Sequence, residues 1–347
     1  MEPEHLFPAE RNAQATVAVL FVTEEESMLA ARVRVFILFS GLMVADSVDA
    51  YAAKRGNRPS ANSALSLQVA LDRMRLSPGP IDGKIGANTR KALRAFQRAR
   101  GLPETGRLDG AVRQELGKLD EPAIVDYQIS EEDLAGPFIA QIPESLEEQA
   151  KLERLSYTSP EELLAEKFHM DVDLLKSLNP GTRLDKAGST IKVASVDRGD
   201  APTAARLEVN KAIGGVVAFD SDEKIVAFFP ATIGSEETPS PSGKVEVTGI
   251  AKNPTYTYDP AKLNFKGVRA TEKFEIKPGP NNPVGLMWID LSEPGYGIHG
   301  SPEPVEISRQ RSHGCVRLTN WDALDLAQMV REGVLVEFKE KSAAAAN

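Results

Sequence analysis

Apolar residues recur at helical spacing in the first folded part of the chain. Between residues 64 and 116 they lie three or four positions apart, the spacing that gives a helix one buried face. Turns rich in glycine and proline at 78–86 and 101–106 interrupt the pattern. We therefore predict a three-helix bundle over residues 64–117, whose periodic apolar positions include Leu67, Val69, Leu71, Met74, Ala92, Leu93, Phe96, Leu108, Val112 and Leu116.

A second helical pattern spans residues 157–196. Ser159, followed by proline and two glutamates, has the form of a capping box that begins a helix. Asp171 begins another helix, which ends at an Asn-Pro-Gly sequence, and residues 188–193 are typical of a closing strand. These residues predict a unit of two helices and strands. His169, inside this unit, is expected on a helix surface.

From residue 205 the pattern changes to short strands separated by glycine and proline turns. A turn between 215–220 and 224–229 predicts a hairpin, and a capping box from Thr319 to Asp322 predicts one helix. Residues 205–339 therefore predict a mainly β, sandwich-like domain with one helix, and the whole chain is predicted to be a multidomain α+β protein. Other expected strands are 206–211, 245–249, 285–291, 295–299 and 334–338.

Three segments lack periodicity. Residues 51–63 are a polar linker, and residues 118–156 are acidic, contain several prolines and are predicted to connect two domains. The alanine-rich end, residues 340–347, is expected to be a disordered tail.

Composition limits the function classes. The 347 residues are 41% hydrophobic and 26% charged, as in folded proteins, and the net charge of −9 argues against a nucleic-acid partner. The single cysteine excludes an intramolecular disulfide bond.

The leader, residues 1–50, has the features of an export signal. Arginines precede an apolar run at 35–45, and small residues follow it near Ala50, as in a secretory signal peptide. The run is shorter than a membrane span requires. Cleavage and a periplasmic location are expected, with an uncleaved anchor or a buried helix as alternatives. Met28 is a better-placed start than Met1, so residues 1–27 are interpreted as an over-extended start.

The single cysteine, Cys315, lies close to two of the four histidines, His299 and His313. A thiol that attacks a peptide carbonyl needs a proton acceptor and donors for the developing oxyanion, and an adjacent imidazole raises the thiolate fraction. Without such neighbours a lone cysteine is usually a small buried apolar residue. The three residues could also bind a catalytic zinc, but no nearby carboxylate is suited to act as the base of such a hydrolase.

The sequences Ile-His-Gly-Ser-Pro at 298–302 and Ser-His-Gly-Cys-Val-Arg-Leu at 312–318 resemble the signature of L,D-transpeptidase (YkuD-type) catalytic domains. The resemblance covers about residues 205–338. It departs at Ser308, where related sequences usually have glycine. It implies that Cys315 is the nucleophile and that His299, oriented by the backbone carbonyl near Gly300, is the general base and acid. It also implies oxyanion donors at the backbone of Gly314 and Cys315, and it favours a positioning role for His313 in the oxyanion region over the alternative role as the base.

Four further side chains are candidates for substrate binding. Arg317 could hold a stem-peptide carboxylate or form a structural salt bridge. Ser312 could hydrogen-bond His313 or the loop. Tyr256 and Trp288 could line the cleft, although aromatic residues in β-domains more often belong to the core.

The two helical segments resemble wall-binding modules. Residues 64–117 resemble the peptidoglycan-binding type 1 domain through Ile-Asp-Gly at 81–83 and Ala-Leu-x-x-Phe-Gln at 92–97. Residues 157–196 resemble a degenerate LysM domain, a βααβ unit, in which Thr-Ser-Pro at 158–160 replaces the usual Gly-Asp-Thr opening.

Taken together, the resemblances imply an enzyme that needs no metal or cofactor and acts on peptidoglycan tetrapeptide stems. It would release D-alanine, form a thioester on Cys315 and transfer the acyl group to an amine, giving a 3→3 cross-link. Alternatives are attachment of an outer-membrane protein to the wall, detachment of that protein, L,D-carboxypeptidase activity, or a wall-binding scaffold without activity. Carbapenems are expected to add covalently to Cys315.

Overall fold

The computed structural model describes residues 64–116, 122–234, 238–261, 268, 270–309, 312 and 314–340. These residues belong to one compact unit. The predicted leader and the tail beyond residue 340 lie outside the described residues, so the start site, the signal and the location remain predictions. Within the described residues no helix is both long and apolar enough to cross a membrane.

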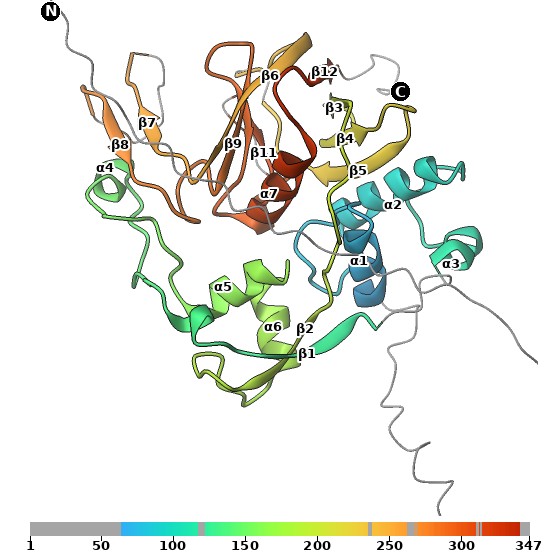
Figure 1. Ribbon diagram of the computed structural model, residues 1–347, viewed down its shortest axis with the longest axis horizontal. Coiled ribbons are helices and arrows are strands. Elements are labelled where there is room, and N and C mark those ends of the chain that lie inside the picture. Colours follow the sequence, from blue (N-terminus) through green and yellow to red (C-terminus); the bar gives the residue numbers. More distant parts are fainter. Residues whose placement is uncertain are drawn as a thin grey trace, which may run out of the picture. The chain divides into compact units, whose positions relative to one another are not determined.

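The first module consists of three helices (Figure 1). They are α1 (Ala64–Arg73), α2 (Ala87–Ala99) and α3 (Gly110–Leu116), and they confirm the helical prediction. Leu67, Leu93 and Phe96 are buried in their core. The same core includes Val217 and Phe228 of the third module, so the bundle packs directly against that module's sheet.

The second module is a βααβ unit. Strand β1 (Ile124–Gln128) pairs antiparallel with β2 (Thr190–Ala194), and helices α5 (Pro160–Lys167) and α6 (Val172–Leu178) lie between them in the chain. Ser159 caps α5 by accepting from the Glu162 backbone N–H, as predicted. The segment before α5 also contains a 3-10 turn, η1 (Glu132–Leu134), and the short α4 (Leu146–Gln149).

Strand β1 differs from the sequence prediction, because it lies inside the segment 118–156 that was interpreted as a connector. Its alternating residues Val125 and Tyr127 pack against the core that contains Ile129, a short period-two pattern that the connector interpretation overlooked. The strand exists through its pairing with β2, from Ile124 opposite Ala194 to Gln128 opposite Thr190. That partner is remote in sequence, so the local pattern alone does not identify it.

The third module is built on a sheet of eight strands. In chain order they are β3 (Arg206–Asn210), β4 (Gly215–Phe219), β5 (Ile225–Pro230), β6 (Gly243–Lys252), β9 (Met287–Leu291), β10 (Gly297–His299), β11 (Val316–Arg317) and β12 (Leu335–Lys339). Across the sheet the order is β11-β10-β9-β6-β12-β3-β4-β5. Strands β7 (Tyr256–Tyr258) and β8 (Phe274–Ile276) form a separate antiparallel pair, which lies between β6 and β9 in the chain.

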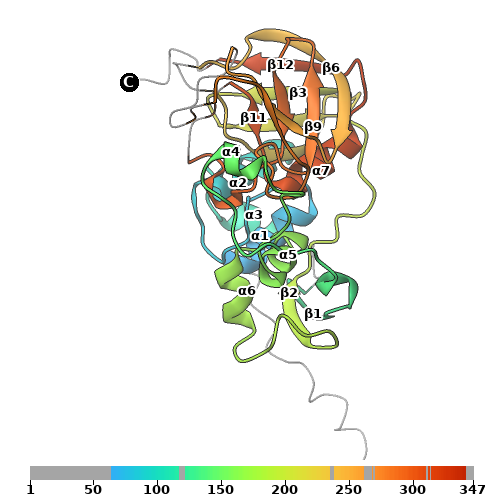
Figure 2. The same cartoon turned by 90° about the vertical axis from the view of Figure 1, so that its left-hand side faces the viewer.

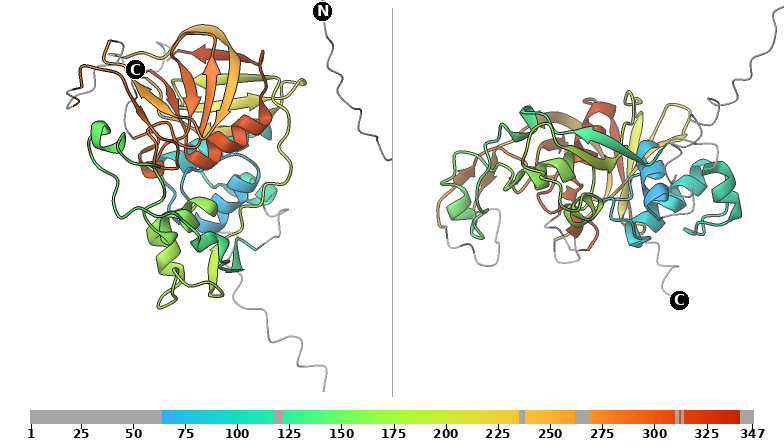
Figure 3. Two further views of the ribbon diagram at one scale, coloured as in Figure 1. Left: turned by 60° about the vertical axis from the view of Figure 1, so that its left-hand side comes forward. Right: turned by 90° about the horizontal axis from the view of Figure 1, so that it is seen from below.

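The long strand β6 joins the two halves of this sheet. Its first part pairs with β12 and its second part with β9, and the register shifts between Val247 and Gly249. A β-bulge of this kind bends a strand and increases its twist, and the sheet curls around its own core (Figures 2 and 3). The mainly β, curled architecture confirms the predicted fold class.

Helix α7 (Asn320–Met329) covers the core of this sheet. Thr319 caps it by accepting from the Asp322 backbone N–H, as the capping box predicts. Leu326 and Met329 on the helix are buried against Ile289 of β9. Because α7 follows the cysteine by a few residues, burial of this helix also fixes the end of the cysteine segment.

A buried ionic cluster joins the three modules. The guanidinium of Arg198, which follows β2, lies 2.6 Å from Asp72 of α1, 3.3 Å from Asp322 and 2.9 Å from Asp325 of α7. Arg75 also contacts Asp325. These side chains are almost fully buried, and a buried charge needs partners of opposite sign. The cluster therefore holds the modules in one arrangement.

The surface position predicted for His169 is wrong. The residue follows α5 with a φ of 55°, its side chain is 14% exposed, and its Nδ1 lies 3.1 Å from Asp72. Its ring stacks on Trp321 of α7 at 5.3 Å. The sequence around His169 gave no sign of these partners, because both come from other modules.

Candidate active site

The cysteine and the first histidine of the motif come together through strand pairing. Strands β10 and β11 are parallel neighbours, with Ile298 opposite Val316 and His299 opposite Arg317. Side chains alternate between faces along each strand. Cys315 directly precedes β11, and the backbone N–H of Gly297 in β10 faces its thiol. Strand pairing therefore places the cysteine segment beside the strand that carries His299.

His299 is oriented by its own backbone neighbour. Its Nδ1 atom lies 2.7 Å from the carbonyl oxygen of Gly300, the contact expected from the sequence. A carbonyl oxygen only accepts hydrogen bonds, so Nδ1 carries the proton and Nε2 is left with a lone pair. The residue is 3% exposed. Burial, together with the nearby Arg317 guanidinium, lowers the pKa of His299 to about 3, so the imidazole is neutral at physiological pH.

Cys315 is partly buried, and its thiol is protonated in the resting enzyme. Its Sγ lies 3.8 Å from the Gly295 carbonyl oxygen, to which the thiol can donate. Burial raises the pKa of Cys315, while the Gly297 backbone N–H and Arg317 oppose the shift. The sequence led us to expect a larger thiolate fraction. That expectation is wrong for the resting state, because the buried imidazole stays neutral and supplies no stabilising positive charge.

The turn before the cysteine depends on glycine. Gly314 has a φ of 108°, and a Cβ there would lie 2.7 Å from Cε1 of Tyr296 and 3.2 Å from the Pro239 carbonyl oxygen. Ser240 donates to the Gly314 carbonyl at 2.5 Å. Only a residue without a side chain fits this turn, and the oxyanion donors expected at the Gly314 and Cys315 backbone stay a prediction.

Ser312, the serine of the Ser-His-Gly-Cys motif, stabilises the same loop. Ser312 Oγ donates to the Cys315 carbonyl oxygen at 2.6 Å, so its side chain bonds the loop rather than a substrate. The backbone carbonyl of Ser312 accepts from Thr238 at 3.0 Å. His313 lies outside the described residues, so its predicted positioning role, and the zinc alternative that includes it, stay untested.

Arg317 presents a guanidinium beside the candidate base. No salt bridge to Arg317 is found among the described residues, and its buried Nε has no hydrogen-bond partner there. A guanidinium with an open donor fork is suited to a carboxylate. The structural salt bridge considered from the sequence is therefore absent from this part of the chain, which favours the carboxylate-binding alternative.

The two aromatic candidates lie next to the reacting groups. Trp288 of β9 is opposite His299 in the sheet, and the two rings stack at 5.4 Å with an interplanar angle of 18°. Tyr256 is half-buried, and burial followed by the nearby Cys315 raises the pKa of its phenol. Both residues therefore border the cysteine–histidine pair.

Ser308, where related sequences usually have glycine, has a φ of 71°. Glycine adopts this left-handed region without steric penalty, which explains why it is usual at this position. Here the serine is held by its own contacts: its backbone N–H donates to Thr232 Oγ1 at 2.8 Å and its hydroxyl to the Ala231 carbonyl at 3.1 Å.

Sequence reasoning missed the contacts of Asn320, which follows the motif at the start of α7. This residue is fully buried, and its Oδ1 accepts from the Leu286 backbone N–H at 3.0 Å. A Cβ at Gly300 would lie 2.3 Å from the same oxygen. Its place just after the Cys-Val-Arg-Leu sequence could have drawn attention to it, but its partners come from distant segments.

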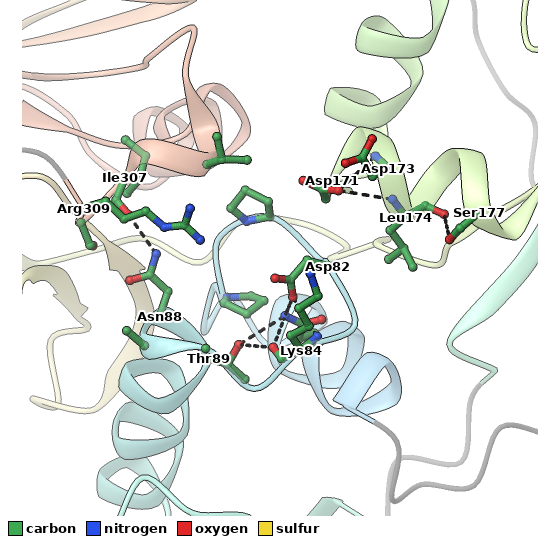
Figure 4. A pocket seen from close by; sticks show the side chains of 17 residues that line it. Asp82, Lys84, Asn88, Thr89, Asp171, Asp173, Leu174, Ser177, Ile307 and Arg309 are labelled. Atoms are coloured by element: carbon green, nitrogen blue, oxygen red, sulfur yellow. Dashed lines mark hydrogen bonds between the residues drawn. The ribbon is translucent and has the colours of Figure 1, made fainter.

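A cavity of about 490 Å³ lies beside the loop between His299 and the cysteine segment. Figure 4 shows Asn88 and Thr89 of α2, Asp171 and Ser177 from the α6 region, and Ile307 of that loop around it. Asn88 donates to the Ile307 carbonyl oxygen at 3.1 Å. Cys315 and His299 do not line this cavity. It is therefore separate from the reacting pair, although one of its walls is the loop that connects them.

Comparison with known proteins decides the family. The sequence profile of the L,D-transpeptidase catalytic domain (YkuD) matches residues 204–337. This segment belongs to the L,D-transpeptidase catalytic domain family. The profile of the peptidoglycan binding domain matches residues 60–116. The chain thus contains an L,D-transpeptidase catalytic domain, preceded in sequence by a segment that matches a peptidoglycan-binding domain.

Several relatives carry the L,D-transpeptidase name. The YkuD protein of Bacillus licheniformis is 26% identical over 178 residues, which are 50% of this chain and 90% of that protein. The YbiS protein of Escherichia coli K12 is 28% identical over 187 residues, 52% of this chain and 60% of that protein. A solved L,D-transpeptidase from Xylanimonas cellulosilytica is 16% identical, covers 80% of this chain and 92% of that one, and superposes with a TM-score of 0.34. The profile matches at residues 60–116 and 204–337 do not include residues 157–196, so the LysM resemblance stays a prediction.

Proposed function

We propose that this L,D-transpeptidase catalyses acyl transfer on peptidoglycan tetrapeptide stems through a thioester on Cys315. The observation that supports the proposal most directly is the pairing of the His299 strand with the strand that directly follows Cys315, together with an imidazole whose Nδ1 is held by the Gly300 carbonyl. A thiol, an oriented imidazole and backbone donors at the glycine turn are the parts that the proposed acyl transfer requires.

The first half-reaction forms the acyl-enzyme. Cys315 Sγ attacks the carbonyl carbon between the third residue of the stem and the terminal D-alanine, and its proton passes to His299 Nε2. The S–C bond forms, the C–N bond breaks, and the imidazolium returns the proton to the leaving amine of D-alanine. Because the resting pair is neutral, proton transfer accompanies attack rather than preceding it. The low pKa of His299 makes its protonated form a strong acid for the leaving group.

The second half-reaction transfers the acyl group. An amine from the diamino acid of another stem attacks the thioester, gives a proton to His299, and displaces the thiolate, which takes that proton back. The product is a 3→3 cross-link. Thioesters react with amines more readily than oxyesters do, which favours transfer over hydrolysis. Arg317, with its open donor fork, is suited to a carboxylate of one of the two stems.

We further propose that the chain is exported to the periplasm and acts at the wall. The support is the signal-peptide pattern before residue 50 and the peptidoglycan-binding domain at residues 60–116. The same site chemistry would also serve an amine of an outer-membrane protein as acceptor, or water.

Digestion of muropeptides from purified sacculi incubated with the enzyme tests the proposal. New dimers linked between third residues are expected, with none from the Cys315→Ser variant. Loss of D-alanine alone would identify a carboxypeptidase, and release or attachment of protein would identify a protein acceptor. Sacculi unchanged by an enzyme that is folded would overturn the proposed reaction.

A further inference from the structure

The amide of Asn320 supports the backbone on which His299 rests. Cβ atoms at Gly285 and Gly300 would lie 2.0 and 2.3 Å from its Oδ1 atom, so the amide occupies the space against both glycines. Gly300 is the residue whose carbonyl accepts the His299 Nδ1 proton. The Asn320 amide therefore packs directly against the residue whose carbonyl sets the ring orientation and tautomer of His299.

The other end of this amide is held by a different module. Asn320 Nδ2 lies 3.0 and 3.2 Å from the two carboxyl oxygens of Glu166, which is on α5 of the second module. Its remaining acceptor is the Pro280 carbonyl oxygen at 3.0 Å. With two acceptors on Nδ2 and the Leu286 N–H on Oδ1, the amide can adopt one orientation only.

Other residues of the second module also form hydrogen bonds near Glu166. Glu162, one turn earlier, accepts from Asn281 Nδ2 at 2.8 Å, and Tyr157 donates to Glu166 at 3.4 Å. The backbone of Leu155 also pairs with the 278–281 segment, through bonds of 3.1 and 2.9 Å. The second module thus hydrogen-bonds the loop that leads into β9 at several points. Glu166 is the residue of this module that bonds the Asn320 side chain.

The surroundings of Glu166 favour its protonated form. The charged or titratable groups that face it are Glu162 and Tyr157, and no cation pairs with it among the described residues. Burial, with Glu162 adding to it, raises the pKa of Glu166 to about 8, although the hydrogen bonds from Asn320 and Tyr157 oppose the shift. The carboxyl therefore acts near neutrality mainly as a neutral acceptor for Asn320.

We propose that Glu166 of the second module is a positioning residue for the acyl-transfer reaction. Its carboxyl fixes the Asn320 amide, and the amide fixes the Gly300 carbonyl that holds His299. This inference rests on the proposed function. It gives the βααβ unit a task at the catalytic centre that is independent of whether the unit binds the wall.

Two variants of Glu166 test the proposal by changing the hydrogen-bond acceptor for Asn320 Nδ2, and a third variant serves as a control. Glu166→Leu removes the acceptor, Glu166→Gln keeps one, and Glu161→Ala changes a neighbouring glutamate of α5 whose side chain takes no part in the Asn320 contacts. Rates of Cys315 acylation by a carbapenem are measured from pH 4 to 9. In parallel, the His299 ring nitrogens are observed by 15N NMR, with His299→Gln identifying the signal.

Glu166→Leu is expected to slow acylation at pH 7 by roughly ten- to hundred-fold, the order of effect that displaced catalytic groups produce. It should also raise the His299 pKa toward the ordinary value of about 6.5, because the ring becomes wetter and less well held. Glu166→Gln should restore the wild-type rate at pH 7 to within about two-fold, and Glu161→Ala should match the wild type. A merely structural role would lower stability without moving the His299 signal.

The result that overturns the inference is a Glu166→Leu enzyme whose rate profile and His299 signal equal those of the wild type. If Glu166→Leu does not fold, Glu166→Asp, which withdraws the carboxyl by one methylene, is expected to show the same changes in weaker form, and its equality with the wild type would overturn the inference as well. A wild type that forms no Cys315 adduct at any pH would instead contradict the proposed function, while the His299 signal would still test the Glu166–Asn320 contact.

Discussion

His299 Nδ1 lies 2.7 Å from the carbonyl oxygen of Gly300, and this one contact fixes which ring nitrogen can act as the base. In many thiol enzymes a carboxylate or an amide side chain orients the histidine, but here the partner is the backbone. A carbonyl carries no full charge, so it stabilises an imidazolium less than a carboxylate would. The buried ring therefore stays neutral at rest.

The pH dependence of acylation should reflect this neutral pair. Because burial lowers the His299 pKa to about 3, the base is unprotonated down to about pH 4, and the acylation rate should not fall by half near pH 6.5. Because burial raises the Cys315 pKa, alkylation by iodoacetamide should still be rising at pH 9. Carbapenem acylation rates across the pH range check the His299 expectation, and iodoacetamide alkylation rates check the Cys315 expectation. Circular dichroism at each pH is the folding control. A midpoint near pH 6.5 would contradict the neutral, buried base.

Replacing Arg317 by glutamine should weaken use of the tetrapeptide stem. Loss of a charged hydrogen bond of about 1.5–3 kcal/mol corresponds to a decrease in kcat/KM of roughly ten- to hundred-fold. Arg317→Lys should recover only part of this, because lysine lacks the planar fork. The exposed Arg309 offers a matched control, and Arg309→Gln is expected to leave kcat/KM unchanged. Equal effects of the two glutamine variants would argue against carboxylate binding by Arg317.

The glycine before the cysteine should tolerate no side chain. In Gly314→Ala the new Cβ meets Tyr296 at 2.7 Å and must also adopt a φ of 108°, so the turn has to shift. We expect acylation to fall by at least about a hundred-fold. Gly333→Ala, at a φ of 83° with open space around the Cβ, imposes a left-handed backbone without the collision. Stopped-flow acylation rates of the two variants separate collision from backbone strain, and similar losses would show that the Tyr296 contact is unimportant.

Much of the fold was predictable from the sequence, because its signals are local. The periodicity of Leu93 and Phe96, the Thr319 cap and the hairpin at 215–229 each depend on residues within one or two turns of the chain. The pairing of His299 with the cysteine segment was also within reach, since two short contiguous motifs contain both.

The features that were missed depend on residues far apart in the sequence. Strand β1 is defined by β2, and the burial of His169 is defined by Asp72, 97 residues earlier. The raised pKa of Cys315 depends on burial, which no sequence motif expresses. The role of Glu166 likewise requires knowing that α5 contacts Asn320, 154 residues later.

Removing a member of the buried ionic cluster should destabilise the protein without touching the active site. Asp72→Asn leaves Arg198 without its nearest carboxylate, and losing one partner of a buried pair costs about 3–5 kcal/mol. Arg198 and His169 hold the Asp72 pKa below its ordinary value against the effect of burial. A depressed carboxyl pKa contributes stability that is complete above about pH 4 and is lost as pH falls further.

Urea unfolding of the two proteins at pH 7 and at pH 3 measures this difference. It should be large at pH 7 and smaller at pH 3. A difference that grew toward pH 3, or was absent at pH 7, would show that the cluster does not stabilise the fold as described.

The most direct test of the whole account is the intact mass of the protein after incubation with a carbapenem, followed by peptide mapping. The wild type should gain one adduct, located on Cys315, while Cys315→Ser should gain none and His299→Gln should react at least about a hundred-fold more slowly. An unmodified wild type, or an adduct on any other residue, would contradict the assignment of Cys315 as the nucleophile activated by His299.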